Sequence, residues 1–132
     1  MTFAATRYRE NDVFTMSPGH RVVALYSHLL LRLRQARVAI EQRDIPARSA
    51  HLGRAMDVLH ELLSSLDPEQ GGKLADQLAA LYVYLIGELA AVDARPGVAR
   101  LDPVIRIVGE LHGAWAAAAQ AAPAPGPAPA AG

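Results

Sequence analysis

One junction between two apolar segments constrains the fold more than any other stretch of the sequence. Its residues are Ser64-Ser65-Leu66-Asp67-Pro68-Glu69-Gln70-Gly71-Gly72-Lys73. Asp67 is a good N-cap residue, and Pro68 suits the first helical position because its missing N–H is not needed there. Gly71 and Gly72 weaken a first helical turn by roughly 1 kcal/mol each relative to alanine. The junction therefore predicts a helix start that bends or lets a backbone come close, although a flexible turn between two helices is the alternative.

The first long helix is predicted to run from Ser17-Pro18 to about Arg43. Apolar side chains recur at alternating four- and three-residue steps and so share one core-facing stripe: Val22, Tyr26, Leu29, Leu33, Ala36 and Ile40. Ala24, Leu31 and Val38 project to the opposite side at about 100° per residue. Leu31 and Val38 are therefore expected to be exposed, as part of a binding surface or as ordinary scattered apolar residues.

Three further helices are expected. One spans about residues 46–65, one follows the glycine pair to about Ala94, and the last begins at Asp102 or near Val98 with a bend. The third helix has a predicted core stripe of Leu74, Leu78, Leu81, Leu85, Leu89 and Val92. Its other faces are apolar too and include Tyr82, Val83 and Ile86. A helix that is apolar around most of its circumference is buried on several sides or offers one side to a partner, and we favour a partner here.

The composition favours an all-α protein with a single domain of residues 17–119. The chain has 132 residues, of which 52% are hydrophobic and only 5% aromatic, and this balance is typical of a helical bundle. Residues 1–16 are predicted to form an N-terminal arm or short helix laid on the bundle, with a disordered terminus as the alternative. Residues 120–132 are rich in alanine and proline and are predicted to be a disordered tail.

The sequence gives little support to catalysis or metal binding. There is no cysteine, which excludes disulfides and thiolate nucleophiles. The five histidines show no H-E-x-x-H spacing, and the nearest match to a bundle metal motif, Asp57 followed by His60, occurs once. Gly71-Gly72-Lys73 lacks the frame of a phosphate-binding loop. We therefore expect no catalytic residues, no metal site and no cofactor.

Charge and hydropathy limit the classes of partner and the cellular compartment that the sequence predicts. The formal net charge is zero, so no overall field attracts nucleic acid or an acidic membrane surface. Arg7, Arg9, Glu10 and Asp12 interrupt any apolar run of a signal peptide. No apolar segment is expected to be long enough to span a bilayer. A cytoplasmic protein without nucleic-acid binding or membrane insertion is therefore predicted.

Several residues occur in the order of a known family pattern. They are Tyr8, Asn11 and Val13 before Ser17-Pro18, Leu25-Tyr26, Ser65-Leu66-Asp67 before Gly71-Gly72, Leu78 with Leu81-Tyr82 and Tyr84, and Trp115. Over about residues 4–116 the sequence resembles the flagellar export chaperone FliS family. The segment from Ser65 to Tyr82 is the most specific part of this resemblance. Ser27-His28 and Pro103 depart from the family pattern.

The resemblance implies an antiparallel four-helix bundle that binds the C-terminal segment of flagellin in the cytoplasm. It implies that binding prevents premature polymerisation and supports delivery to the flagellar type III export apparatus. A disordered amphipathic segment can wrap the apolar grooves of such a chaperone and partly fold there. The alternative is a helical adaptor or regulator with a different partner. Export-gate components and a homodimer of the free protein stay open as further partners.

Six residues are predicted to contact flagellin, two from family positions and four from helical geometry alone. The family positions are Tyr8 and Tyr82, and the geometric ones are Leu31, Val38, Val83 and Ile86. Tyr26 instead falls within the core stripe of the first helix. The arm that carries Tyr8 is hypothesised to cover a groove in the free protein, so that deletion of residues 1–16 would tighten or speed flagellin binding.

Overall fold

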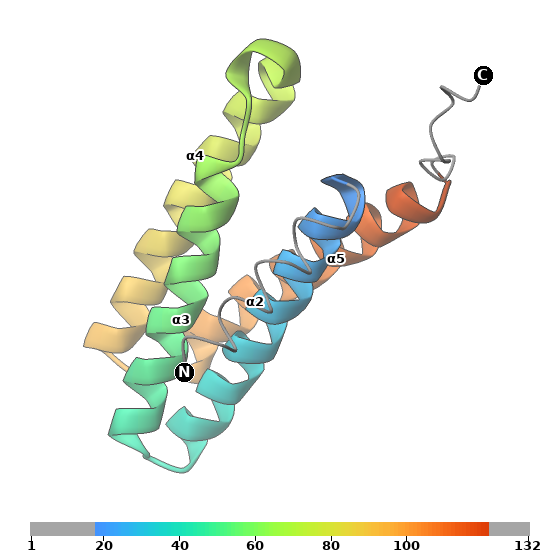
Figure 1. The fold of residues 1–132 in the computed structure, drawn as a ribbon. Coiled ribbons are helices and arrows are strands. Elements are labelled where there is room, and N and C mark those ends of the chain that lie inside the picture. The colour runs from blue at the N-terminus through green and yellow to red at the C-terminus, as the bar shows by residue number, and fades with distance from the viewer. Residues whose placement is uncertain (1–17, 122–132) are drawn as a thin grey trace, which may run out of the picture.

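The computed structural model describes residues 18–121, which form four helices and no strand. The helices are α2 (Pro18–Glu41), α3 (Ile45–Ser64), α4 (Pro68–Ala94) and α5 (Val98–Ala121). Short turns join them, so that consecutive helices run antiparallel (Figure 1). The predicted all-α four-helix bundle is confirmed. The predicted arm with Tyr8 lies outside the described residues, as does the predicted tail of residues 120–132 except for Gln120 and Ala121, which are helical.

The helices form two pairs that separate toward one end of the molecule. α2 packs against α3 and α5, α3 packs against α4, and α4 touches α5 over a shorter length. Figure 1 shows the α3–α4 pair and the α2–α5 pair close together near the α2–α3 turn and apart near the α3–α4 turn. The bundle is therefore open at the end where α3 turns into α4.

The turn between α2 and α3 is a Schellman motif with an unusual residue. Arg43 has φ 57°, the left-handed conformation that glycine adopts most readily. Its N–H donates to the Ile40 carbonyl at 3.1 Å, and the Asp44 N–H donates to the Ala39 carbonyl at 2.9 Å. Asp44 then caps α3, because its Oδ1 accepts from the Ala47 N–H at 3.1 Å. α2 consequently ends at Glu41, slightly earlier than predicted.

The two glycines of the α3–α4 junction have separate roles. Asp67 Oδ1 accepts hydrogen bonds from the N–H groups of Glu69 and Gln70, which confirms the predicted N-cap. Gly72 has φ 54° and ψ −132°, and this non-helical residue kinks α4 (Figure 1). A Cβ atom on Gly71 would lie 2.7 Å from Ala75 Cβ, so the first glycine permits a close approach. The predicted bend is confirmed, whereas the close contact at Gly71 is with the Ala75 side chain of the same helix and not with a backbone.

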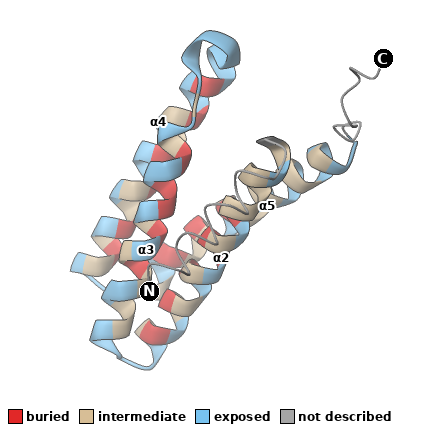
Figure 2. Cartoon of the chain, in the orientation of Figure 1, coloured by how far each residue is buried: buried red, intermediate tan, exposed pale blue. Residues whose placement is uncertain are grey.

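The core lies along the inner faces of all four helices (Figure 2). Four members of the stripe predicted for the first helix are fully buried, namely Tyr26, Leu29, Leu33 and Ala36. On α4 the buried residues are Ala75, Leu78, Tyr82, Leu85, Leu89 and Val92. Tyr82 thus occupies the core position predicted for Leu81, which is only partly buried, and Leu74 is exposed. The prediction was wrong at these positions because it assigned the core to leucine and did not foresee a buried partner for the tyrosine hydroxyl.

Of the two starts predicted for the last helix, the one near Val98 is confirmed, whereas one expectation about membrane spans needs correction. α5 begins at Val98 and contains Pro103 inside the helix, so it does not start at Asp102. By length and composition alone, α4 is apolar enough to cross a membrane, contrary to the prediction that no segment is long enough. This is weak evidence of a span, since the core helix of a soluble protein passes the same test, and α4 places one face in the core.

Candidate functional site

An apolar hollow of about 200 Å³ lies at the open end of the bundle, between the ends of all four helices. We call it the apical groove. Its lining residues come from the start of α2, the end of α3, the start of α4 and the later part of α5: Val22, Leu62, Ser65, Leu66, Asp67, Gly71, Leu74, Ala75, Leu78, Tyr82 and Trp115. Most of these side chains are apolar, so the groove is suited to bind apolar side chains of another polypeptide.

Three aromatic side chains support the floor of the apical groove. The ring centroid of Tyr26 lies 6.4 Å from that of Tyr82 and 6.4 Å from that of Trp115, in tilted arrangements. The hydroxyl oxygens of the two tyrosines lie 2.7 Å apart. Burial raises the pKa of both phenols, and for Tyr82 the hydrogen bond with Tyr26 raises it further. Both phenols therefore stay neutral near pH 7, and the floor carries no charge.

The kink at Gly72 shapes the rim of the groove. Leu74 lies two residues after Gly72 and is 55% exposed, whereas Ala75 turns into the core and packs close to Gly71. A leucine exposed next to Leu66 and Leu78 extends the apolar lining outward from the core. The junction that dominates the sequence therefore supplies part of the rim of the groove.

The predicted contact residues fall into two groups. Leu31 and Val38 on α2 and Val83 on α4 are exposed, as their helical positions indicated, but none of them lines the apical groove. Ile86 is partly buried and packs against the core. Tyr82 does not lie on an exposed helix face, because it is only 2% exposed and forms part of the groove floor. Contact of these residues with flagellin stays a prediction.

The apical groove was not predicted from the sequence, although most of its residues were named. Val22 was predicted to face the core, and Leu66 and Trp115 were named only as junction or family positions. They line a groove because the helix pairs diverge, and divergence depends on distant packing that no local pattern specifies. The available signal was the Gly71-Gly72 pair, which predicted a bend beside this end of the bundle.

Polar contacts outside the groove join helices to one another. Arg37 on α2 donates from Nε and Nη2 to the two carboxylate oxygens of Asp102 on α5, at 2.7 and 3.2 Å. This contact lowers the pKa of the Asp102 carboxyl. Ser27 and His112 join the same two helices through Oγ and Nε2 at 2.8 Å. Within residues 18–121 there is no group of three or more histidine, aspartate or glutamate side chains that could hold a metal ion.

Comparisons with known proteins point to a single family. The family model described as flagellar protein FliS matches residues 1–122. The flagellar secretion chaperone FliS of Vibrio cholerae is 31% identical over 106 residues, covering 80% of this chain and 78% of that protein. The flagellar secretion chaperone FliSB of Pseudomonas aeruginosa is 33% identical over 106 residues, covering 80% and 84%. A crystal structure of a bacterial flagellar chaperone has the same fold, with a TM-score of 0.74 at 20% identity, and covers 89% of this chain and 95% of that one.

Proposed function

This chain belongs to the FliS family of flagellar proteins, and from that premise we propose that it binds the C-terminal segment of flagellin in the cytoplasm. Binding keeps the segment from assembling with other flagellin copies and supports its delivery to the flagellar type III export apparatus. The role is non-catalytic, as is that of the chaperone family. No cofactor enters the proposal.

One observation carries the proposal: an apolar groove that is open to solvent and has an uncharged aromatic floor. An amphipathic segment without stable structure of its own gains about 1.5–3 kcal/mol for each large apolar side chain that it buries. It loses part of that gain in ordering its backbone. Such binding is reversible without any chemical step, which suits a chaperone that must release its cargo for export.

The exposed apolar side chains extend the proposed surface beyond the groove. Leu31 and Val38 on α2 and Val83 on α4 are each about half exposed. A long flagellin segment that enters the apical groove can also lie along these helices, because a segment that folds on binding can wrap several faces of its partner. Tyr8 and the N-terminal arm belong to the same proposal as a cover that moves aside for flagellin.

Calorimetric titration of the full chain with the C-terminal peptide of flagellin from the same cell tests the proposal. We expect a saturating one-to-one isotherm with a negative heat-capacity change, because apolar surface is buried on binding. A flat trace, with circular dichroism showing folded protein, would overturn the proposal. The alternative, a helical adaptor or regulator with another partner, would then apply.

A further inference from the structure

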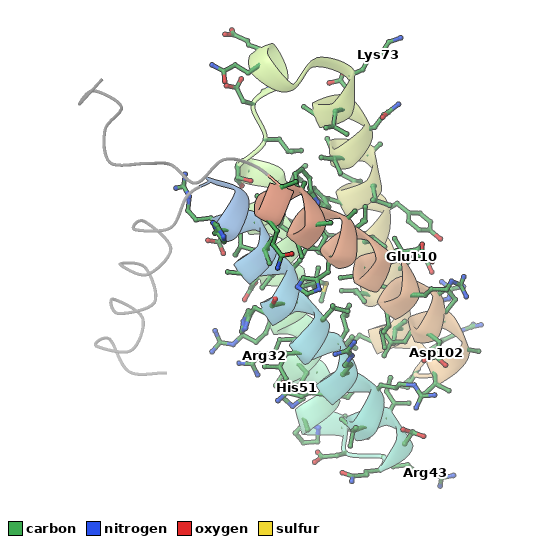
Figure 3. The ribbon with its side chains drawn as sticks, turned by 90° about the vertical axis from the view of Figure 1, so that its right-hand side faces the viewer. Arg32, Arg43, His51, Lys73, Asp102 and Glu110 are labelled. Carbon is green, nitrogen blue, oxygen red and sulfur yellow. The ribbon has the colours of Figure 1, made fainter. Side chains whose placement is uncertain are left out.

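A second hollow, of about 350 Å³, lies at the end of the bundle opposite the apical groove. We call it the basal pocket. It is formed by the end of α2, the start of α3 and the α4–α5 turn, and its lining residues are Ala39, Ile40, Arg43, Asp44, Ile45, Arg48 and Pro96. Figure 3 labels Arg43 at this end of the molecule and Lys73 at the other. The two hollows share no residue.

The basal pocket has an apolar wall that is open to solvent. Ile45 is 61% exposed, the highest exposure among the large apolar side chains of residues 18–121. Ile40 is partly buried against the core, and Pro96 closes the pocket from the α4–α5 turn. An apolar side chain of a partner that entered this hollow would cover Ile45, which the fold itself leaves in water.

Two arginines and one aspartate line the basal pocket, and one of the arginines has no ion-pair partner among residues 18–121. Arg48 donates from Nε to Asp93 Oδ1 at 3.2 Å, and Glu41 accepts from Arg37 at 2.8 Å. Asp44 uses its carboxylate to cap α3. Among residues 18–121, no side chain pairs with the guanidinium of Arg43. This group is therefore available for a carboxylate outside the chain.

The backbone conformation of Arg43 also supports a binding role for this residue. Glycine adopts its left-handed conformation without strain, whereas arginine is strained there. Strain of this kind persists where the surrounding structure imposes it, and it is concentrated at binding sites. An arginine at this position adds nothing to the turn that glycine would not supply, but it adds a cationic side chain to a residue that lines the basal pocket.

We propose that the basal pocket binds an acidic segment of a partner protein in which one large apolar side chain is flanked by carboxylates. The apolar side chain fills the hollow against Ile40, Ile45 and Pro96. A flanking carboxylate pairs with the Arg43 guanidinium, which can bind both carboxylate oxygens at once. This second interaction is independent of flagellin binding at the apical groove, so the chaperone can hold both partners together.

A short peptide of defined sequence, acetyl-Glu-Asp-Leu-Asp-Glu-amide, is a suitable probe. Titrated into the full ¹⁵N-labelled chain, it should shift the amide signals of Ile40, Asp44 and Ile45 and leave those of Leu66 and Leu74 unchanged. A matched peptide with lysine in place of each acidic residue should cause no saturable shift. Equal binding of the two peptides, or shifts confined to the apical groove, would overturn the proposal.

Two variants of the full chain sharpen the test without disturbing the fold. Arg43→Gly keeps the backbone conformation and removes the guanidinium, and it should weaken binding of the acidic peptide by at least about tenfold. Arg34→Ala removes an exposed guanidinium outside the pocket and should leave the affinity unchanged. If Arg43→Gly bound the acidic peptide as tightly as the unaltered chain, the pocket would not be the site. Both variants should bind the flagellin peptide normally, which separates this proposal from the one on function.

Discussion

The hydroxyl oxygens of Tyr26 and Tyr82 lie 2.7 Å apart and connect α2 with α4. Among the described helices, α2 and α4 lie diagonally across the bundle, and their backbones make no contact. The hydrogen bond therefore joins the two diverging helix pairs directly beneath the apical groove. Because both side chains are almost fully buried, neither hydroxyl can exchange its partner for bulk water without opening the core.

Removing one of the two hydroxyls should lower the free energy of unfolding more than removing both. Tyr82→Phe leaves the buried Tyr26 hydroxyl without its tyrosine partner, and this should lower the free energy of unfolding by about 1–3 kcal/mol. Tyr26→Phe combined with Tyr82→Phe removes both groups and should recover most of that loss. Urea denaturation of the single and double variants measures the difference. Additive losses in the double variant would contradict a direct interaction between the two hydroxyls.

The same tyrosines should make the fold sensitive to alkali. Their pKa values are raised in the folded state, whereas in the unfolded chain they are about 10. Above that pH the unfolded chain releases protons that the folded chain keeps, so the free energy of unfolding falls as pH rises. Well above pH 10 the slope should approach about 1.4 kcal/mol per pH unit for each tyrosine. The stability contributed by the neutral phenols is fully present below pH 10.

Denaturation curves between pH 9 and 12 check this dependence, because the full slope is reached only well above pH 10. Replacing both Tyr26 and Tyr82 by phenylalanine should make the slope shallower by the contribution of two protons. Tyr84 is the matched control because it is 55% exposed, and Tyr84→Phe should leave the slope nearly unchanged. A slope that responds to Tyr84→Phe and not to the buried pair would show that this explanation is wrong.

The contrast between Tyr26 and Tyr82 shows which buried positions could be predicted from the sequence. Tyr26 lies on a regular stripe of three- and four-residue steps, so its burial was predictable from periodicity. Tyr82 lies next to Leu81 on a helix that is apolar around most of its circumference, so periodicity does not distinguish the two positions. Tyr82 can be buried without an unsatisfied hydroxyl because its partner hydroxyl lies 56 residues away in the chain, and a local pattern does not reveal that partner. Caps and glycines are local and were predicted; the apical groove depends on how two helix pairs diverge and was not.

The kink at the start of α4 should tolerate no side chain at Gly72. Its φ of 54° with ψ of −132° lies where alanine is strained, so Gly72→Ala should lower the free energy of unfolding by about 1–3 kcal/mol or straighten the helix. Gly87 lies in the middle of the same helix with nothing within 4 Å of an added Cβ atom. Gly87→Ala should instead stabilise by up to about 1 kcal/mol. Thermal unfolding of both variants provides the comparison, and equal effects would contradict the assigned role of Gly72.

In the turn between α2 and α3, a substitution to glycine should stabilise the protein, whereas replacing Gly72 should destabilise it. Arg43 has a left-handed backbone, and Arg43→Gly relieves the strain at this second residue after the end of α2. We expect a gain of about 0.5–1 kcal/mol in the free energy of unfolding, reduced by the greater freedom of glycine in the unfolded chain. Arg43→Ala removes the same guanidinium and keeps the strain, so it is the matched control. A loss of stability in Arg43→Gly would mean that the guanidinium makes a stabilising contact.

Aspartate substitutions at exposed leucines should show which surface flagellin uses first. Leu74 and Leu31 are about equally exposed, at 55% and 50%, so neither Leu74→Asp nor Leu31→Asp should unfold the protein. Only Leu74 lines the apical groove, and a carboxylate there would have to be desolvated when an apolar side chain binds. If the groove is the principal site, Leu74→Asp should raise the dissociation constant for the flagellin peptide by at least about tenfold. Leu31→Asp should then raise it by less than about threefold, since a peripheral contact contributes under 1 kcal/mol. The reverse order in a calorimetric titration would move the principal site to the outer face of α2.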